Sequence, residues 1–376
     1  MHLVLVINSL GIGGAERILI RLAHYWADSG HKISFITFFQ EEKFSYQLAS
    51  NNINLINLGE DKLSSSKLSF IQHFFKIVKR VCLLRNKIKL LQPDMVVSFL
   101  VGANISVLLA NIGFKVPVIV SERADPFMHN IPTFYKKLRF LIYQQAAAIT
   151  VQTQAIASYF VSKFQKNVFV IPNFVKSPKI KKDIREKTSI SKVNKVTKII
   201  SVGRLDEQKD HKTLIYAFAK LSNDYPDLTL TIYGDGELRG FLQNLIMDLN
   251  LQDRVFLPGI SMDVEKNLVA ADLFVFPSIA EGFSNALSEA MSCGLPVIAA
   301  DCAGNMNIIE HEVNGLLFKC GNVEELVLLM QRLLNNPEYC NKLAINAQNI
   351  VNKFSEVGIL KLWDDVLEFS RAVVVY

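Results

Sequence analysis

The feature that most constrains the fold of this chain is a regular alternation of short apolar runs with helical patterns. The apolar runs lie at residues 3–7, 33–38, 53–56, 95–98, 118–120, 148–151, 168–171, 197–202, 228–233, 255–257, 273–276, 297–300 and 315–318. Amphipathic helical patterns separate several of these runs, for example at residues 15–27, 70–89, 211–221 and 238–249. Such alternation indicates βαβ units, in which helices cover both faces of a mostly parallel sheet. The predicted fold class is therefore α/β, with doubly wound sheets.

The rhythm breaks once, between residues 172 and 195, where two prolines and seven lysines replace the apolar pattern. We therefore predict two Rossmann-like domains, residues 1–172 and 197–354, joined by a linker at residues 173–196. A length of 376 residues agrees with two domains. The C-terminal helical pattern, within residues 355–376, could pack back on the first domain. The expected active site is the central cleft that the two domains face.

Composition excludes several classes of protein. Half of the residues are hydrophobic and 20% are charged, as in globular proteins with buried sheets. The uncharged run at residues 95–114 contains polar residues and glycines, so we interpret it as a strand, a turn and a helix. The apolar start lacks the features of a signal peptide and predicts a buried strand. Five cysteines without metal-ligand spacing predict reduced thiols in the cytoplasm and no metal site.

The charge is unevenly distributed along the chain. Residues 1–175 carry 19 Lys+Arg against 9 Asp+Glu, whereas the remaining residues are net acidic. The excess concentrates at residues 61–90, where eight basic residues alternate with apolar ones beside a single acid, Asp61. This pattern is typical of a helix that lies on an anionic membrane surface, although a surface helix packed on its own sheet shows it too. The acidic second half and the absence of a recognition motif argue against binding of nucleic acid.

The first strand leads into a glycine-rich loop that contains Gly13 and Gly14. Such a loop lets the backbone approach a phosphate at the start of a helix. The loop lacks the last glycine of the dinucleotide-binding pattern, because position 16 is Glu, and no acid ends the second strand. A nicotinamide dinucleotide is therefore disfavoured.

Three loops of the second half also follow predicted strands. In the first, Arg204 and Lys209 lie five residues apart after Gly203, where cations can neutralise a diphosphate leaving group; an ordinary charged loop is the alternative. The other two could let the backbone approach a flat base. Their residues are Gly234, Asp235, Leu257 and Pro258.

A pair of glutamates, Glu281 and Glu289, follows the strand-like run at residues 273–276. Ligands of α/β proteins bind where strands end and helices begin. One carboxylate in the loop and one in the helix can therefore contact two parts of a nucleotide-sugar, the sugar and the ribose. The alternative interpretation is a polar turn before a solvated helix start.

Taken in order, these motifs resemble the glycosyltransferases of family 4. They are Gly13-Gly14-Ala15-Glu16-Arg17, Gly203-Arg204 with Lys209, Gly234-Asp235-Gly236, Leu257-Pro258-Gly259, the stretch from Glu281 to Glu289, and Gly294-Leu295-Pro296-Val297. The resemblance implies a GT-B fold in which the first domain binds mainly the acceptor and the second mainly the donor. It implies retaining transfer from a nucleotide-sugar, with no metal and no other cofactor.

The same resemblance implies roles for single residues. Arg204 and Lys209 would bind the diphosphate, Glu281 the donor sugar and Glu289 the ribose. Gly13 and Gly14 would let the first domain close over the donor phosphates. The backbone that would hold phosphate and sugar belongs to Gly282, Phe283, Ser284 and Asn285.

The segment at residues 121–126 resembles the Ser-Glu-Arg-x-x-Pro motif of bacterial transferases that act on polyprenyl-linked glycans, often with N-acetylhexosamine donors. Glu122, Arg123 and Asp125 would then lie near the acceptor hydroxyl. The alternative is a local ion pair between Glu122 and Arg123 that braces the loop.

The expected protein is thus a retaining hexosyltransferase of bacterial surface polysaccharide, lipopolysaccharide or glycolipid synthesis. The donor would be a UDP-hexose or UDP-N-acetylhexosamine, and the acceptor a lipid-linked or growing glycan. The expected location is cytoplasmic and peripheral, on the inner face of the plasma membrane. Two alternatives remain: a GT-B epimerase of free nucleotide-sugars, and an inactive subunit that binds a nucleotide-sugar.

Overall fold

The structure is a computed structural model that describes residues 1–11, 13–39, 52–60, 70–124, 126, 133–164, 166–179 and 196–373, with the backbone alone at residues 70–74. The chain forms two compact units. Unit 1 comprises Met1–Asn173 and Val357–Tyr376, and unit 2 comprises Phe174–Glu356. Residues 180–195 of the expected linker lie outside the described residues.

Unit 1 contains a seven-stranded parallel sheet with the order β3-β2-β1-β4-β5-β6-β7. Its strands are β1 (His2–Ile7), β2 (Lys32–Thr37), β3 (Ile53–Asn57), β4 (Met95–Phe99), β5 (Val118–Ser121), β6 (Ala148–Val151) and β7 (Val168–Val170). Its helices are α1 (Gly14–Asp28), α2 (Phe70–Leu91), α3 (Val101–Asn111), α4 (Thr133–Ile142), the short 3-10 helix η2 (Tyr143–Gln145), α5 (Gln154–Phe164) and α14 (Glu356–Val373).

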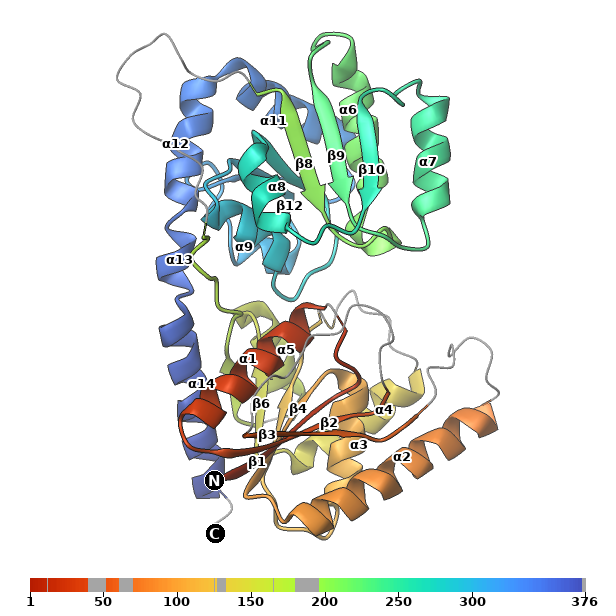
Figure 1. Cartoon of the computed structure of the whole chain (residues 1–376), viewed down its shortest axis with the longest axis vertical. Helices are drawn as coiled ribbons and strands as arrows, with labels where there is room; N and C mark the ends of the chain where they lie inside the picture. Colours follow the sequence, from red (N-terminus) through yellow and green to blue (C-terminus); the bar gives the residue numbers. More distant parts are fainter. Residues whose placement is uncertain are drawn as a thin grey trace. The chain divides into compact units, whose positions relative to one another are not determined.

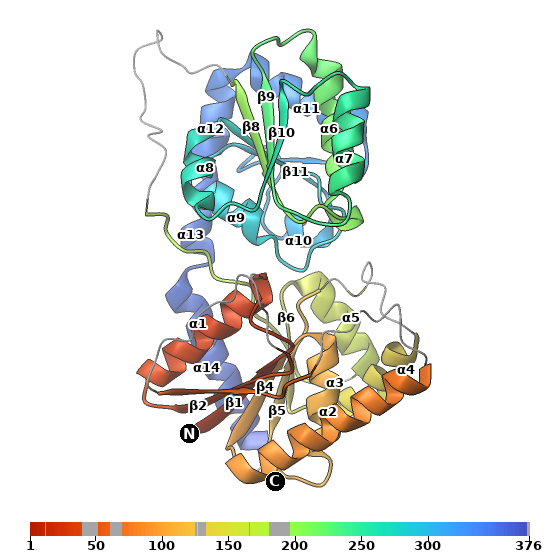
Figure 2. The ribbon, with the colours of Figure 1, turned by 45° about the vertical axis from the view of Figure 1, so that its right-hand side comes forward.

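The helices of unit 1 cover both faces of its sheet. Side chains alternate across a strand, so Val4 and Val6 of β1 face one side, where they share a core with α2, α3 and α5. Helices α1 and α14 lie on the other side (Figures 1 and 2). Strands buried on both faces need continuous apolar sequences, which explains the apolar run of the central strand β1; the edge strand β3 is mostly exposed and contains two asparagines.

The C-terminal helix α14 is anchored in unit 1 by aromatic and polar contacts. Trp363 is fully buried, stacks on Phe99 with ring centroids 5.5 Å apart, and meets the ring of Trp26 edge-on. Its neighbour Asp364 accepts hydrogen bonds from Tyr25 Oη at 2.6 Å and Trp26 Nε1 at 3.0 Å. The last helix is therefore an integral part of unit 1.

Unit 2 contains a six-stranded parallel sheet with the order β10-β9-β8-β11-β12-β13. Its strands are β8 (Lys198–Val202), β9 (Thr229–Tyr233), β10 (Val255–Gly259), β11 (Leu273–Phe276), β12 (Val297–Ala300) and β13 (Leu316–Phe318). Its helices are η4 (Glu207–Lys209), α6 (His211–Ser222), α7 (Arg239–Asp248), α8 (Val264–Ala270), α9 (Asn285–Ser292), α10 (Ala303–Met306), α11 (Val323–Asn335), α12 (Pro337–Ala347) and α13 (Ile350–Lys353).

The two faces of the second sheet carry separate cores. Helices α6, α7 and α11 share one core with the β-strands, and α8, α9 and α13 share the other. Figure 2 shows helices on both sides of this sheet. The predicted doubly wound α/β class is confirmed in both units.

Every predicted strand is present in the structure, and no boundary differs by more than two residues. The uncharged run at residues 95–114 forms β4, a turn and α3, as predicted. Within the described part of the chain, no helix is long and apolar enough to cross a membrane.

We predict that Trp363→Ala lowers the free energy of unfolding of unit 1 by about 3–5 kcal/mol, because the truncation leaves a cavity between α14, α1 and β4. Both tryptophans of the chain lie in unit 1, so fluorescence of the remaining Trp26 during urea titration reports on this unit. The matched control is Val357→Ala in the same helix, at a side chain that is 81% exposed. A loss below about 1 kcal/mol for Trp363→Ala would show that α14 does not stabilise unit 1.

Candidate active site

The candidate site in unit 2 is created by the pairing of β8 with β11. The strands run parallel, with Leu273 opposite Ile199 and Phe274 opposite Ile200. Parallel strands end at the same edge of a sheet, and the strand order reverses direction here, as at the ligand-binding crevices of open α/β sheets. The loop after β8, residues 203–210, therefore lies beside the loop after β11, residues 277–284.

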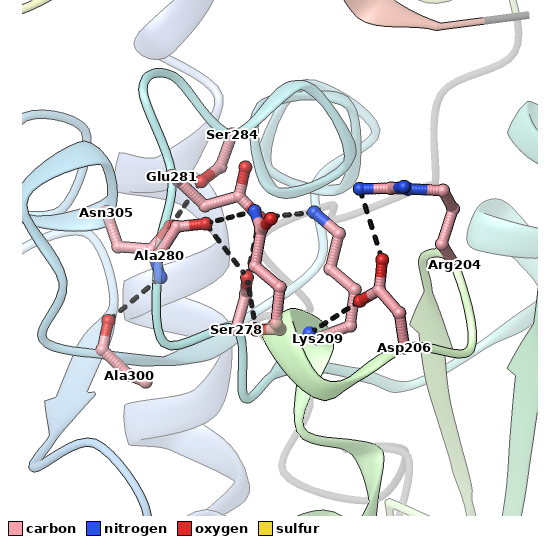
Figure 3. Close-up of polar contacts among 10 residues, drawn as sticks. Arg204, Asp206, Lys209, Ser278, Ala280, Glu281, Ser284, Ala300 and Asn305 are labelled. Atoms are coloured by element: carbon pink, nitrogen blue, oxygen red, sulfur yellow. Dashed lines mark hydrogen bonds and ion pairs between the residues drawn. The ribbon is translucent and has the colours of Figure 1, made fainter. Parts of the chain in front are cut away.

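Lys209 and Glu281 meet at this edge. Lys209 Nζ contacts Glu281 Oε1 in an ion pair, and Ser278 Oγ donates a hydrogen bond of 2.6 Å to the same carboxylate oxygen (Figure 3). Glu281 is only 9% exposed. The carboxylate therefore has a fixed orientation before any ligand binds.

Backbone and amide contacts join the two loops around this pair. The backbone carbonyl of Gln208 accepts a hydrogen bond from Ile279 N at 3.0 Å, and the Gln208 side chain donates to the carbonyl of Ala280. On the other side, Asn305 accepts a hydrogen bond from Ser284 Oγ and donates one of 2.9 Å to the carbonyl of Ala300. These residues hold the segment at residues 278–284 in place.

Arg204 lies on the outer side of the same loop. Its side chain is 72% exposed and forms an ion pair of 3.1 Å with Asp206. The Asp206 carboxylate also accepts a hydrogen bond from the backbone nitrogen of Lys209 at 3.1 Å. Figure 3 shows the side chains of Arg204 and Lys209 extending toward the same region. The structure thus brings together Arg204, Lys209 and Glu281, three residues predicted from the sequence.

The alternative interpretation, a polar turn before a solvated helix start, agrees with the structure only in part, because residues 281–284 are buried and Asn285 is partly exposed. Gly282 is buried, Phe283 packs edge-on against the ring of Phe354, and Ser284 precedes helix α9, which begins at Asn285. The buried loop therefore brings the N-terminus of an eight-residue helix next to Glu281. Glu289 lies further along α9 and is partly exposed.

The loops after β9 and β10 lie next to the loop after β8. Leu205 N donates to the carbonyl of Asp235 at 3.0 Å, and Gly234 N donates to the carbonyl of Gly259 at 2.9 Å. Leu257 and Pro258 belong to β10 itself. Backbone groups of three neighbouring strand ends therefore line one edge of the sheet; the prediction that Leu257 and Pro258 follow their strand is wrong, because β10 extends to Gly259.

In unit 1, Gly13 and Gly14 lie at the start of α1, as predicted. Glu122 follows β5, is 2% exposed, accepts a hydrogen bond from Tyr143 Oη, and has Arg139 Nη1 at 3.8 Å. Burial raises the pKa of Glu122. The expected contact of Glu122 with an acceptor hydroxyl stays a prediction.

Glu122 does not form the local ion pair with Arg123 that was the alternative interpretation. Its partner is Arg139 of α4, whereas Arg123 donates to Asn173 Oδ1 at 2.9 Å and lies over the ring of Phe99. Arg123 is thus tied to the end of unit 1. Asp125 lies outside the described residues.

Sequence reasoning missed Ser278, Gln208, Asn305 and His211. Ser278 and Gln208 are single polar residues beside predicted site residues, and Asn305 ends a loop of small residues. Nothing in their spacing reveals their contacts. Among the described residues, no cluster of His, Cys, Asp and Glu is suited to a metal ion.

Two doubly wound units with parallel sheets define the fold class GT-B. The second unit carries two cations, Arg204 and Lys209, and the acid Glu281 at one edge of its sheet. Solved structures agree with the fold class. Sucrose-phosphate synthase from Thermosynechococcus elongatus superposes with a TM-score of 0.84 at 19% identity, over 99% of this chain and 100% of that one. Anabaena HepE in complex with UDP superposes with a TM-score of 0.75 at 21% identity, over 98% of this chain and 100% of that one. At such identities the likeness establishes the fold alone.

The sequence matches two family models that together span most of the chain. Residues 12–177 match Glycosyltransferase Family 4, and residues 181–350 match Glycosyl transferases group 1. The chain therefore belongs to the glycosyltransferases of this family, and the predicted resemblance is confirmed.

Curated relatives include three informative proteins. An uncharacterized glycosyltransferase of Methanocaldococcus jannaschii is 36% identical over 64% of each chain. A Campylobacter jejuni 4-alpha-N-acetylgalactosaminyltransferase, named for a diphospho-undecaprenol-linked acceptor, is 28% identical over 94% of this chain and 96% of its own. An Escherichia coli alpha-1,3-galactosyltransferase, named for UDP-Gal and a diphosphoundecaprenol-linked acceptor, is 32% identical over 50% of this chain and 52% of its own.

The site also predicts a dependence of stability on pH. Burial lowers the pKa of His211 to about 4, and the charge of Lys209 acts in the same direction. Between pH 6.5 and pH 4 the unfolded chain binds a proton at His211 that the folded chain does not bind. The contribution of neutral His211 to the free energy of unfolding is therefore complete above pH 6.5 and is lost as the pH falls toward 4. Between pH 7 and pH 5 the loss is about 2 kcal/mol.

We therefore predict that wild type loses about 2 kcal/mol more stability than His211→Met between pH 7 and pH 5. Urea unfolding of unit 2 can be followed by pulsed hydrogen exchange of peptides from β8 and α6. Comparison with the variant removes the contribution of other titrating groups. Equal losses in the two proteins would contradict a neutral, buried His211.

Proposed function

We propose that this glycosyltransferase moves a sugar from a uridine diphosphate donor to a polyprenyl-diphosphate-linked glycan during synthesis of a bacterial surface polysaccharide. The observation that carries the proposal is the convergence of Lys209, Glu281 and Arg204 at the edge of the second sheet. The names of the Campylobacter and Escherichia relatives support the acceptor class, and UDP-Gal in the second name supports the donor class. A hexose or an N-acetylhexosamine is the proposed sugar.

Charge is the main chemical requirement of such a transfer. As the bond from sugar to diphosphate breaks, negative charge develops on the leaving oxygen, and preorganised cations stabilise it. Arg204 and Lys209 supply that charge in the proposal, so a metal ion is not required. The N-terminus of α9 adds backbone N–H groups and a favourable dipole.

Glu281 would accept hydrogen bonds from hydroxyls of the donor sugar, and Glu289 from the ribose. The proposed transfer retains anomeric configuration by front-side displacement. The acceptor oxygen attacks the anomeric carbon on the face that the diphosphate leaves, and the departing phosphate oxygen takes the acceptor proton. The protein contributes alignment and charge, so a second catalytic carboxylate is unnecessary.

A lipid-linked acceptor requires the enzyme to work at a membrane surface, and we propose that α2 provides the contact. Its inner stripe of Ile77, Leu84 and Ile88 is buried, as expected for a helix packed on a sheet. Its outer face still exposes Val78 and Leu90 beside lysines. The helix contains no acidic residue. Exposed apolar and cationic groups together suit an anionic interface.

Not every basic residue of α2 is available for a membrane. Arg80 forms a bidentate, largely buried ion pair with Glu60, and Arg85 donates to the carbonyls of Ala110 and Ile112. These two arginines stabilise the fold of unit 1. The exposed lysines Lys79 and Lys89 are the residues proposed to meet lipid.

Helix α4 extends this surface, because it lies beside the N-terminal part of α2 (Figures 1 and 2). Its arginine, Arg139, is buried against Glu122, whereas Phe140 and the 68% exposed Leu141 face outward with Lys137. Like α2, it has no acidic residue. An apolar tip flanked by lysines is suited to the headgroup region of a bilayer.

The direct test measures release of nucleoside diphosphate from UDP-, GDP- and ADP-sugars, with and without a polyprenyl-diphosphate glycan, in the presence of a chelator. Release of UDP that depends on the acceptor is expected, with a glycan product that keeps the donor's anomeric configuration. Isomerisation of the donor without acceptor would favour an epimerase. Binding of donor without turnover on any acceptor would favour an inactive subunit.

We predict that Glu281→Gln lowers kcat about 100-fold or more, since the amide keeps the size of the side chain but removes the charge opposite Lys209. The matched control is Glu207→Gln, an exposed glutamate of the same loop that pairs with Lys212. Both variants are assayed with saturating donor and acceptor. Activity of Glu281→Gln within a few-fold of wild type would remove Glu281 from the reaction.

We predict that Lys79→Gln/Lys89→Gln weakens binding to phosphatidylglycerol-containing vesicles, measured by sedimentation, by roughly 30-fold, since each lysine near such a surface contributes about 1 kcal/mol. Binding should also fall with added salt and be weak on pure phosphatidylcholine. Lys342→Gln on unit 2 is the charge control. Equal binding of the double variant and wild type would exclude α2 as the contact.

A further inference from the structure

The two oxygens of the Glu281 carboxylate have different surroundings. Oε1 forms the ion pair with Lys209 Nζ and accepts the 2.6 Å hydrogen bond from Ser278 Oγ (Figure 3). Within the described part of the chain, no donor lies within hydrogen-bond distance of Oε2. The Glu281 side chain is 10% exposed, and Oε2 retains solvent-accessible surface. Oε2 is therefore the carboxylate oxygen that a ligand can reach.

Ser278 contributes a single proton to this arrangement. The residue is fully buried, and its hydroxyl can donate one hydrogen bond. Three acceptors lie near Ser278 Oγ: Glu281 Oε1 at 2.6 Å, the carbonyl of Gln208 at 3.2 Å and the carbonyl of Ala280 at 3.5 Å. Hydrogen bonds to a charged acceptor are the shorter and stronger ones, so the proton belongs to the carboxylate. The hydroxyl thus acts mainly on Glu281 and only weakly on the backbone of the two loops.

The rest of Glu281 has little freedom to move. A Cβ placed on Gly304 would lie 2.6 Å from both the Cβ and the backbone oxygen of Glu281, so the backbone of α10 packs directly against this residue. The rotation that remains easiest is that of the carboxylate about its last bond, because such torsions are broad. The Lys209 ammonium is a point charge on a flexible chain and can pair with either oxygen. The buried Ser278 hydroxyl is short, so it is the group that selects Oε1.

We propose that Ser278 is a positioning residue: it holds Oε1 of Glu281, so that Oε2 alone accepts a hydrogen bond from a hydroxyl of the donor sugar. The inference rests on the proposed function, in which Glu281 binds that sugar. An ionised carboxylate only accepts hydrogen bonds, so the sugar group opposite Oε2 has to be a donor. The consequence is specificity, because the site rejects a sugar that carries another acceptor in place of this one hydroxyl.

The test uses fluorinated donors, because fluorine is close in size to a hydroxyl but donates no hydrogen bond. Calorimetry at pH 7.5 first gives wild-type dissociation constants for UDP, UDP-glucose, UDP-galactose, UDP-N-acetylglucosamine and UDP-N-acetylgalactosamine. The UDP-sugar that binds most tightly is the parent ligand. Its analogues, each with one sugar hydroxyl replaced by fluorine, are then titrated into the wild type and into Ser278→Ala. The matched control is Ser288→Ala, which removes another buried hydroxyl, one that donates to the backbone carbonyl of Ser284 at 2.9 Å.

In the wild type, one fluorinated analogue is expected to bind about 10- to 100-fold more weakly than the parent, as for loss of a hydrogen bond to a charged group. Ser278→Ala should weaken binding of the parent by roughly 5-fold and leave binding of that analogue nearly unchanged, because the two groups are coupled. The ratio of the two dissociation constants therefore falls. A merely structural hydroxyl would weaken binding of both ligands equally, and Ser288→Ala is expected to keep the wild-type ratio.

The inference is overturned if Ser278→Ala keeps the wild-type ratio, or if Ser288→Ala lowers the ratio as much. It is also overturned if the wild type binds the parent and every fluorinated analogue equally, or binds UDP but none of the four UDP-sugars, because no sugar hydroxyl then meets Oε2. If the wild type binds neither UDP nor any UDP-sugar, the proposed function itself fails.

Discussion

The parallel pairing of β8 with β11 is the constraint on which the candidate site depends. It places the loops at residues 203–210 and 277–284 side by side at one edge of the sheet. Without that register the two loops would not be in contact. Lys209 then reaches Glu281, and Gln208 and Ser278 fix the two loops to each other through backbone and side-chain hydrogen bonds. A shift in the position of either strand would separate the cation from the acid, so the apolar packing of the sheet sets the geometry of the charges.

The ion pair between Lys209 and Glu281 has a consequence for binding of a donor. Both side chains are largely buried. Separating two opposite charges costs more in the protein interior than at the surface, because the interior screens them less. In the proposed function, a diphosphate therefore binds beside the ion pair and does not replace Glu281 as the partner of Lys209. The exposed Arg204 has no such restriction and can turn toward the ligand from its ion pair with Asp206. One cation is thus preorganised, and the other can adapt.

The sequence was sufficient for the fold because buried parallel strands need apolar runs, and these runs recur along the chain between amphipathic helical patterns. It also placed Arg204, Lys209 and Glu281 in loops that follow strands, whereas their roles stay predictions. It was insufficient for contacts that depend on three-dimensional neighbours. Ser278 and Asn305 belong to no recognisable motif, and Glu281 is buried beside Gly304 of a distant loop. Arg80 and Arg139 look like surface cations of amphipathic helices, yet Glu60 and Glu122 bind them inside the fold.

The arrangement around Glu122 shows why the loop after β5 is so firmly held. Tyr143 donates a hydrogen bond to the buried carboxylate, Asn104 donates to Tyr143 Oη at 3.0 Å and to the carbonyl of Ser121 at 3.1 Å, and Arg139 lies close by. An acid in such surroundings fixes the position of the backbone that follows it. If the carboxylate moved away, Arg139 and the Tyr143 hydroxyl would stay buried without their partner. Directly after it, Arg123 is fastened to Asn173, where the chain leaves unit 1. Glu122 and Arg123 therefore hold the loop after β5 in place, and their expected contact with an acceptor stays a prediction.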